Sequence, residues 1–189
     1  VSGHHVVTAT PTASGKTIIY NIPFFEKIIK NPDARALYLF PLKALAQDQL
    51  KAFQKMSGYA PSLNATAAVY DGDTTAWHRK KIREKLPNAI LTNPEMLHLS
   101  FLPYHDKWRN FFENLEMVVV DEVHTYRGVM GSHMAQIFRR LHRICETYGS
   151  QPRFVLSSAT IANPAQLSET LIGQPVKAET KSGAPSGKR

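Results

Sequence analysis

Ala9-Thr-Pro-Thr-Ala-Ser-Gly-Lys-Thr17 stands between a short apolar run, residues 5–10, and a stretch of helical periodicity, residues 15–30. A loop that ends in Gly-Lys-Thr, between an apolar strand and the start of a helix, is the setting of a phosphate-binding P-loop. The strict pattern has glycine where this chain has Thr10. Because both flanking elements fit, we favour a phosphate loop over a chance Gly-Lys-Thr turn.

The chemistry of phosphate binding gives each part of this loop a role. Backbone N–H groups from Ala13 to Thr17 can surround phosphate oxygens, and the N-terminus of the next helix adds positive potential. Gly15 lets the backbone approach closely. We expect Lys16 to reach the β- and γ-phosphates and the Thr17 hydroxyl to ligate Mg²⁺. The predicted nucleotide-binding residues here are Thr10, Thr12, Ala13, Ser14, Gly15, Lys16 and Thr17.

Outward from the loop, short apolar runs alternate with longer segments of helical period. The strand candidates are residues 5–10, 36–41, 66–70, 89–92, 117–121 and 153–157. The helix candidates are residues 15–30, 43–56, 75–86, 94–101, 106–112, 132–148 and 164–171. Strands that are almost wholly apolar are buried on both faces, as in a parallel sheet. The pattern predicts a three-layer αβα fold of the α/β class, in which helices cover both faces of a mostly parallel sheet. We expect Pro23 to kink or split the first helix.

An acidic strand end supplies the second half of a nucleotide site. Met117-Val-Val-Val-Asp-Glu-Val-His124 is an apolar strand that ends in two acids and a histidine. Asp121 is placed to hold the Mg²⁺ shell, and Glu122 to orient and deprotonate an attacking water. The alternative is a solvated strand terminus, which the phosphate loop earlier in the chain disfavours. We discount zinc at His124, because no cysteine or histidine partner lies at ligand spacing.

Composition limits the partners and the environment of the chain. It has 189 residues, 43% of them hydrophobic, and a net charge of +8. The single cysteine, Cys145, excludes an internal disulfide framework. The longest apolar runs fall short of a membrane span, so we expect no membrane partner. The positive excess points to a polyanion, most simply nucleic acid, although a solvated basic surface is the plainer explanation of charge alone.

These residues carry a family likeness. The chain resembles the first RecA-like domain of superfamily 2 helicases of the DExH type. Five motifs of that family occur in order, at residues 9–17, 41–49, 92–97, 121–124 and 158–160. The details Tyr70-Asp-Gly-Asp-Thr74 and Asp121-Glu-Val-His-Thr-Tyr-Arg-Gly128 look most like the MrfA (YprA) group and its fungal DNA-repair relatives. The resemblance implies an ATP-dependent helicase that uses ATP and Mg²⁺, moves 3′-to-5′ on DNA, and works in the cytoplasm at the nucleoid.

The resemblance also implies roles for particular residues. The implied catalytic residues are Lys16, Asp121, Glu122 and His124, with Thr17 and Asp121 as the Mg²⁺ ligands. Ser158 and Thr160 are implied to couple the two sites, within hydrogen-bond reach of His124; the alternative is an ordinary turn at a strand end. The implied nucleic-acid contacts are Pro41, Lys43, Ala44, Gln47, Thr92, Asn93, Pro94 and Glu95. A turn at Gly72 and Asp73, on the same strand-end face, is expected to add a contact. The alternative for Thr92-Asn-Pro is an ordinary helix cap, with Asn93 as N-cap and Pro94 at the first helical position. Both can hold together.

Comparison with the family pattern also shows what this stretch lacks. The adenine-contacting element upstream of the phosphate loop and the second RecA-like domain, with its arginine finger, are not in the sequence. We expect residues 1–179 to form one RecA-like domain and residues 180–189 to begin a linker to the second. Single-stranded DNA is the expected nucleic acid, ahead of RNA. Two alternative functions are a nucleic-acid-binding module with a vestigial phosphate loop, and a P-loop ATPase of another family.

Several basic and aromatic residues leave open alternatives. For the basic run at residues 79–85 we slightly favour a solvated helix face over a nucleic-acid contact, and the arginines at 139, 140 and 143 fit the same description. Trp77, His78 and Trp108 could stack on bases, but an isolated aromatic at helical spacing is more often part of a core. Arg127 could reach DNA or the second domain.

Overall fold

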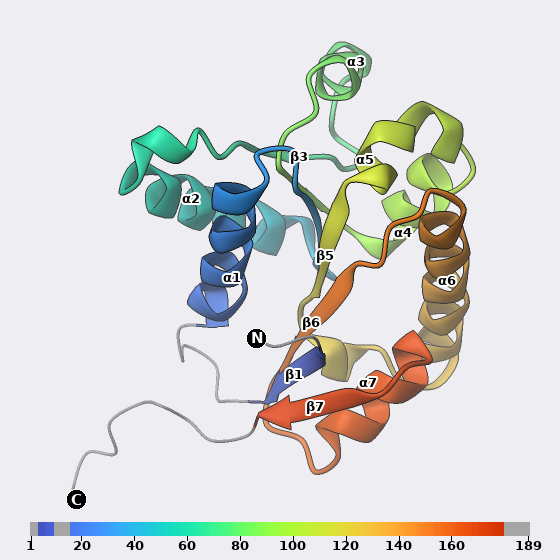
Figure 1. Cartoon of the computed structure of the whole chain (residues 1–189). Coiled ribbons are helices and arrows are strands. Elements are labelled where there is room, and N and C mark those ends of the chain that lie inside the picture. Colours follow the sequence, from blue (N-terminus) through green and yellow to red (C-terminus); the bar gives the residue numbers. More distant parts are fainter. Residues whose placement is uncertain (1–3, 10–15, 180–189) are drawn as a thin grey trace, which may run out of the picture.

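A seven-stranded sheet forms the centre of the computed structural model, which describes residues 4–9 and 16–179 (Figure 1). The strand order is β3-β4-β2-β5-β6-β1-β7, and every neighbouring pair is parallel. The strands are β1 (His5–Ala9), β2 (Arg35–Leu39), β3 (Ala67–Val69), β4 (Ala89–Thr92), β5 (Leu115–Val120), β6 (Arg153–Ser158) and β7 (Val176–Glu179). The predicted α/β fold with a parallel sheet is therefore confirmed.

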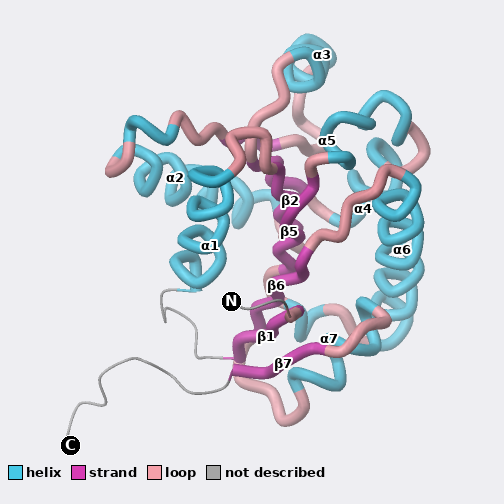
Figure 2. Tube along the Cα trace, in the orientation of Figure 1, coloured by secondary structure: helices cyan, strands magenta, loops and turns pink. Residues whose placement is uncertain are grey.

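Helices connect these strands and cover both faces of the sheet (Figures 1 and 2). They are α1 (Lys16–Lys30), α2 (Lys43–Gly58), α3 (Ala76–Glu84), α4 (Pro94–Met96), α5 (Arg109–Glu113), α6 (Gly128–Thr147) and α7 (Pro164–Ile172). Single turns of 3₁₀ helix lie at Pro61–Leu63, His105–Trp108 and Val123–Thr125, and a π-helical turn follows α4 at Leu97–Phe101. Among the described residues, none of these helices combines the length and the apolar character needed to cross a membrane.

Alternate residues of each central strand pack into two separate cores. On β5, Met117 and Val119 face the core beneath α1 and α2, where Tyr20, Phe24 and Phe53 lie. Val118 and Val120 of the same strand face the core beneath α5 and α6, with residues such as Phe111, Phe138 and Leu141. Because successive side chains of a strand point to opposite faces, a strand buried on both sides must be apolar throughout. Burial of the central strands on both faces thus explains the apolar runs in the sequence.

The structure departs from the sequence-based expectations in two places. Helix α1 continues unbroken through Pro23, with Phe24 and Ile28 anchored in the core beyond it, so packing outweighs the local penalty of proline. The sequence pattern does not predict strand β7, because β7 lies at the sheet edge and only Val176 of its four residues is buried. Trp108, by contrast, agrees with the favoured expectation of a core residue: it is 1% exposed and stacks on Phe101.

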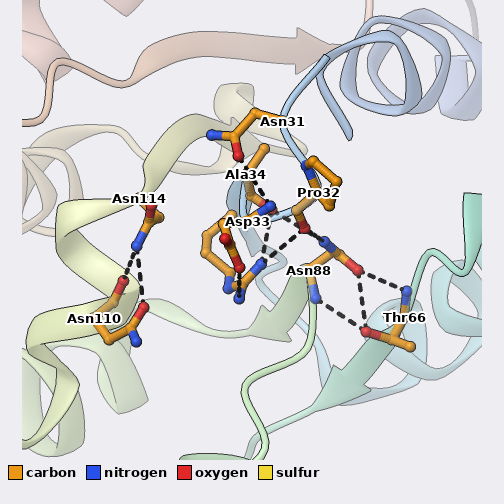
Figure 3. Close-up of polar contacts among 9 residues, drawn as sticks. Asn31, Pro32, Asp33, Ala34, Thr66, Asn88, Asn110 and Asn114 are labelled. Carbon is orange, nitrogen blue, oxygen red and sulfur yellow. Dashed lines mark hydrogen bonds and ion pairs between the residues drawn. The ribbon is translucent and has the colours of Figure 1, made fainter. Parts of the chain in front are cut away.

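One asparagine ties together the amino ends of three strands (Figure 3). Asn88, which is buried just before β4, donates through Nδ2 to the carbonyls of Pro32, at 2.9 Å, and Ala34, at 3.3 Å. Its Oδ1 accepts from the Thr66 N–H at 3.0 Å. A buried amide keeps such contacts because an unpaired polar group there is costly. The starts of β2, β3 and β4 are thus fixed together, which also sets where their carboxyl ends lie.

Two histidines form a polar chain at the opposite edge of the sheet. The Phe154 N–H donates to Nδ1 of His5 at 3.0 Å, and Nε2 of His5 contacts the Gln174 side-chain oxygen. The Gln174 amide nitrogen lies 3.5 Å from Nδ1 of His142, whose Nε2 lies 3.1 Å from the Ile172 carbonyl. These contacts are all satisfied only when each ring carries a single proton, on Nε2.

Acidification is therefore expected to destabilise this edge of the fold. Burial lowers the pKa of His142, and the charge of His5 acts in the same direction against the Ile172 carbonyl and Glu146. The unfolded chain takes up a proton near pH 6.5, before the folded chain does, so this stabilisation is complete above about pH 6.5 and is lost as pH falls below it. Thermal unfolding at pH 7.5 and 5.5 should show a smaller difference for His142→Gln than for the wild type. His4→Gln, at an exposed histidine, should keep the full difference, and an unchanged difference in the His142 variant would contradict the expectation.

Candidate nucleotide and nucleic-acid site

The two halves of the predicted nucleotide site meet at the carboxyl edge of β1, β6 and β5. Ala9, the last residue of β1, is in register with Ser158 of β6, and Val120 of β5 is in register with Leu156. Ligands of open α/β sheets bind at this edge, where the strand order reverses. Lys16 begins α1 here. The predicted loop residues Thr10, Thr12, Ala13, Ser14 and Gly15 lie outside the described residues, as does the Lys16 side chain.

Asp121 follows β5 as a buried carboxylate, with 7% of its surface exposed. Its N–H donates to the Leu39 carbonyl at 3.0 Å, which continues the β2–β5 ladder by one residue. The Ser157 hydroxyl donates to its Oδ1. An ionised carboxylate is costly to bury without such a partner. The side chain is thus fixed at the sheet edge.

Glu122 occupies a backbone conformation that is rare for a residue with a side chain. Its φ is 53°, in the left-handed region, and the 3₁₀ turn Val123–Thr125 begins immediately after it. The Glu122 carbonyl accepts from both the N–H and the hydroxyl of Thr125, at 2.9 and 2.8 Å. This turn directs the chain sharply away from the strand, so the side chain remains at the edge beside Asp121.

His124 connects the acidic strand end to the segment after β6. Its Nδ1 accepts a hydrogen bond from the Ala159 N–H at 3.1 Å. The ring proton of the neutral side chain therefore sits on Nε2, which lies 3.3 Å from Glu122 Oε2. The link to the 158–160 segment therefore comes from the backbone of Ala159, which lies between the two predicted coupling residues. Of these two, Ser158 is buried and Thr160 is exposed. The coupling role of these two side chains stays a prediction.

Thr17 is held by two residues that the sequence did not single out for this site. Its hydroxyl donates to Gln49 Oε1 at 3.0 Å, and the Tyr20 hydroxyl donates to the same oxygen at 2.8 Å. Burial raises the pKa of Tyr20 well above its ordinary value, and the charges of Asp121 and Glu122 raise it further. Tyr20 looks like a core residue in the sequence, and Gln49 ends a motif without an evident partner.

The donor set suits a hard cation held partly by phosphate. Thr17 offers a hydroxyl and Asp121 a carboxylate, and the Tyr20 hydroxyl, 3.5 Å from Thr17 Oγ1, lies within the electrostatic reach of Asp121. In the described ranges, no group of three histidine, cysteine or acidic side chains forms a metal cage. Mg²⁺ commonly takes one or two protein oxygens and completes its shell with substrate phosphates and water. The residues present therefore fit Mg²⁺.

The three segments implied to contact nucleic acid gather around Lys43. Its Nζ lies 2.8 Å from Asp73 Oδ2, and both side chains are exposed. The hydrogen bond that Lys43 donates to Asp73 raises the pKa of Lys43, and the charges of Asp71 and Glu95 act in the same direction. A Cβ on Gly72 would lie 3.4 Å from the Lys43 ammonium. The ends of β2, β3 and β4 thus present their polar residues at one place, as the parallel sheet requires.

A groove of about 800 Å³ begins at this cluster and runs along β3 between α2 and α3. Three exposed residues of the first turns of α2 line one wall: Lys43, Ala44 and Gln47. Pro41 lies just before them and is half-buried. All four residues from this segment are thus near the surface around Lys43.

The segment after β4 is a helix cap. Asn93 Oδ1 accepts from the Met96 N–H at 2.8 Å, and Pro94 is the first residue of α4. The cap interpretation is confirmed. The buried Thr92 hydroxyl donates to the Tyr70 carbonyl, while Glu95 is exposed. A role for Thr92, Asn93, Pro94 and Glu95 in binding nucleic acid stays a prediction.

The turn after β3 is ordered from within. The Asp71 carboxylate accepts from the N–H groups of Asp73 and Thr74, at 2.9 and 3.0 Å. Arg79 of α3 donates to the carbonyls of Asp71 and Thr74, both at 2.9 Å. The basic run is therefore only partly a solvated face: its lysines are exposed, whereas Arg79 is half-buried and holds this turn.

Comparison with known proteins bears on this arrangement. The family model for the DEAD/DEAH box helicase matches residues 1–167. The chain is 50% identical over 187 residues to the uncharacterized ATP-dependent helicase YprA of Bacillus subtilis, which covers 99% of the chain and 25% of YprA. It is 42% identical over 189 residues to the ATP-dependent helicase HRQ1 of Saccharomyces cerevisiae, covering 98% of the chain and 18% of that relative.

A solved structure shares the fold closely. The crystal structure of the DUF1998 helicase MrfA bound to DNA and AMPPNP matches with a TM-score of 0.91 and 50% identity, over 98% of this chain and 26% of the MrfA chain. The chain spans about a quarter or less of the length of the curated relatives it matches. The resemblance to the MrfA (YprA) group is confirmed. With the family model matching most of the chain, the protein belongs to the DEAD/DEAH box helicase family, of which it has the first RecA-like domain.

Proposed function

We propose that the chain is the ATP-binding half of a helicase motor that couples hydrolysis of Mg-ATP to 3′-to-5′ movement on single-stranded DNA. The observation that carries the proposal is the polar connection between Glu122, His124 and Ala159. It links the acid at the end of β5 to the segment after β6, so a shift of the Glu122 side chain would alter the position of the segment after β6. In this proposal the motor works in the cytoplasm, at the nucleoid, and a second RecA-like domain of the same polypeptide completes it.

The residues divide the work of phosphoryl transfer. Lys16 binds the β- and γ-phosphates, and Thr17 and Asp121 hold Mg²⁺, which when bound neutralises charge on those phosphates. Ser157 fixes the Asp121 carboxylate in place. Glu122 orients the water and accepts its proton, while His124 donates to the Glu122 carboxylate and keeps it at the sheet edge. Such a division leaves little covalent work for the protein beyond positioning.

DNA is proposed to lie across the cluster around Lys43. The MrfA structure similar to this chain contains DNA, which favours DNA over RNA. The contacts expected here are to phosphates, which fix a strand without reading its sequence. Asp73 pairs with Lys43 in the structure, so a phosphate that binds Lys43 competes with that carboxylate.

This competition gives a test in which two variants move in opposite directions. Lys43→Ala should weaken binding of a fluorescent oligo-dT strand equally for all sequences and reduce the slope of log affinity against log salt by about one. Asp73→Asn should strengthen binding a few-fold at low salt, because it frees the lysine. Fluorescence anisotropy across a salt series measures both effects.

A matched control for Lys43 is Lys51, an exposed lysine on α2 that pairs with Asp48 away from the cluster. Lys51→Ala should leave the salt slope unchanged. Equal slopes for the wild type and Lys43→Ala, together with unaltered affinity for Asp73→Asn, would place the strand elsewhere on the domain.

A further inference from the structure

Helix α2 presents two different polar residues to two different sites. Successive helix residues are rotated by about 100°, so Gln47 and Gln49 point to nearly opposite sides. Gln47 is exposed and lines the groove beside Lys43, where nucleic acid is proposed to bind. Gln49 is half-buried and faces α1, where its amide oxygen meets Thr17. One rigid helix therefore touches the nucleotide site and the nucleic-acid site.

The contact with α1 is more specific than ordinary helix packing. One oxygen, Gln49 Oε1, accepts two hydroxyl hydrogen bonds, from Thr17 at 3.0 Å and from Tyr20 at 2.8 Å. Tyr20 is 2% exposed, and its ring packs edge-on against Tyr38 of β2 at a centroid distance of 5.6 Å. The tyrosine is fixed by the core, so it in turn fixes the amide. Of the two bonds, only the one from Thr17 involves a residue expected to bind Mg²⁺, so it is the one that responds to the nucleotide site.

We propose that Gln49, held by Tyr20, is a positioning residue that transmits occupancy of the Mg-nucleotide site at Thr17 to α2, and thereby changes the affinity for nucleic acid. This inference rests on the proposed function. A cation on the Thr17 oxygen withdraws electron density and makes the hydroxyl a stronger donor, which tightens the bond to Gln49. The bond fixes α2 relative to α1, and with it Lys43, Ala44 and Gln47 in the first turns of α2.

The test measures DNA affinity rather than turnover. In the full-length protein, binding of a fluorescent oligo-dT strand is measured by anisotropy with no nucleotide and with Mg-AMPPNP. For the wild type the two dissociation constants should differ on the order of tenfold, a usual size for coupled sites. Gln49→Met, which keeps the length but loses the acceptor, should bring the ratio to within about twofold of one. Gln49→Glu, which keeps an acceptor oxygen, should restore most of it.

Matched controls distinguish coupling between the two sites from direct contact with DNA and from helix packing. Gln47→Met, on the other side of α2, should weaken DNA binding equally in both states and leave the ratio unchanged. Tyr20→Phe should reduce the ratio partly, because Thr17 still donates to Gln49. With EDTA in place of Mg²⁺, the wild-type ratio should fall to that of Gln49→Met. Because coupling is reciprocal, titration of AMPPNP with and without DNA should give the same ratios.

The outcomes distinguish this inference from the function on which it rests. The wild-type ratio of DNA dissociation constants could differ clearly from one and stay the same in Gln49→Met. That result overturns the transmission role and spares the proposed function. A wild-type ratio of one overturns it too, because nothing is then transmitted. Failure of the wild type to bind Mg-AMPPNP or DNA at all overturns the proposed function and this inference together.

Discussion

Glu122→Gln is expected to lower DNA-stimulated ATP turnover of the full-length protein about a thousandfold while Mg-ATP binding changes little. A positioned general base contributes roughly 10²–10⁴ to a rate, and the amide cannot accept a proton from water. The substitution keeps the size of the side chain and leaves a carbonyl oxygen that can still accept from His124 Nε2. Phosphate release measures turnover, and titration calorimetry with AMPPNP measures binding.

A second acid on β5 provides the control for this experiment. Glu116 lies at the start of the strand, where it pairs with Lys27 of α1. Glu116→Gln changes the same functional group at the opposite end of β5 and should leave turnover within about twofold of the wild type. Turnover within tenfold of the wild type for Glu122→Gln would remove this residue from the role of base and direct attention to other groups at the sheet edge.

Lys16→Ala is expected to weaken Mg-AMPPNP binding on the order of a hundredfold. Hydrogen bonds to charged groups are worth about 1.5–3 kcal/mol each, and the lysine is expected to meet two phosphates. Lysine is a residue type that is rarely fully buried, so we expect the fold to survive the substitution. Circular dichroism should therefore show a folded protein, and calorimetry should show the lost affinity.

Lys30 allows a matched comparison at the other end of the same helix. It is exposed in the last turn of α1, so Lys30→Ala removes the same charge without touching the phosphate loop. Affinity for Mg-AMPPNP should then stay within about twofold of the wild type. Equal affinity for both variants would show that the loop at residues 9–17 does not bind phosphate through Lys16.

The sequence could predict the sheet and the acidic strand end because both depend on local patterns. The strands had to be apolar throughout, since both faces of the sheet are covered, and Asp121 and Glu122 follow one of those strands directly. The Asn93 cap was equally local. In each case the residues that form the feature lie within one element or at its end.

Most contacts between elements could not be predicted, for a physical reason. Ser157 meets Asp121 only because β5 and β6 pair in a register that sets Val120 opposite Leu156. The spacing of residues along the chain does not determine that register. Tyr20 and Gln49 likewise meet through the packing of α1 on α2, which depends on the whole core between them. The residues that support the candidate site are therefore brought to it by tertiary packing, whereas its acids and its loop follow from local sequence patterns.

The left-handed backbone of Glu122 sets stability and chemistry against each other at one position. A residue with a side chain in this region costs about 1–2 kcal/mol, whereas glycine adopts it freely. Selection for thermal stability alone would accept glycine at position 122, and the resulting domain would fold better without its acid. Any programme to stabilise this domain by consensus or directed evolution must hold position 122 fixed, or screen for turnover at every round.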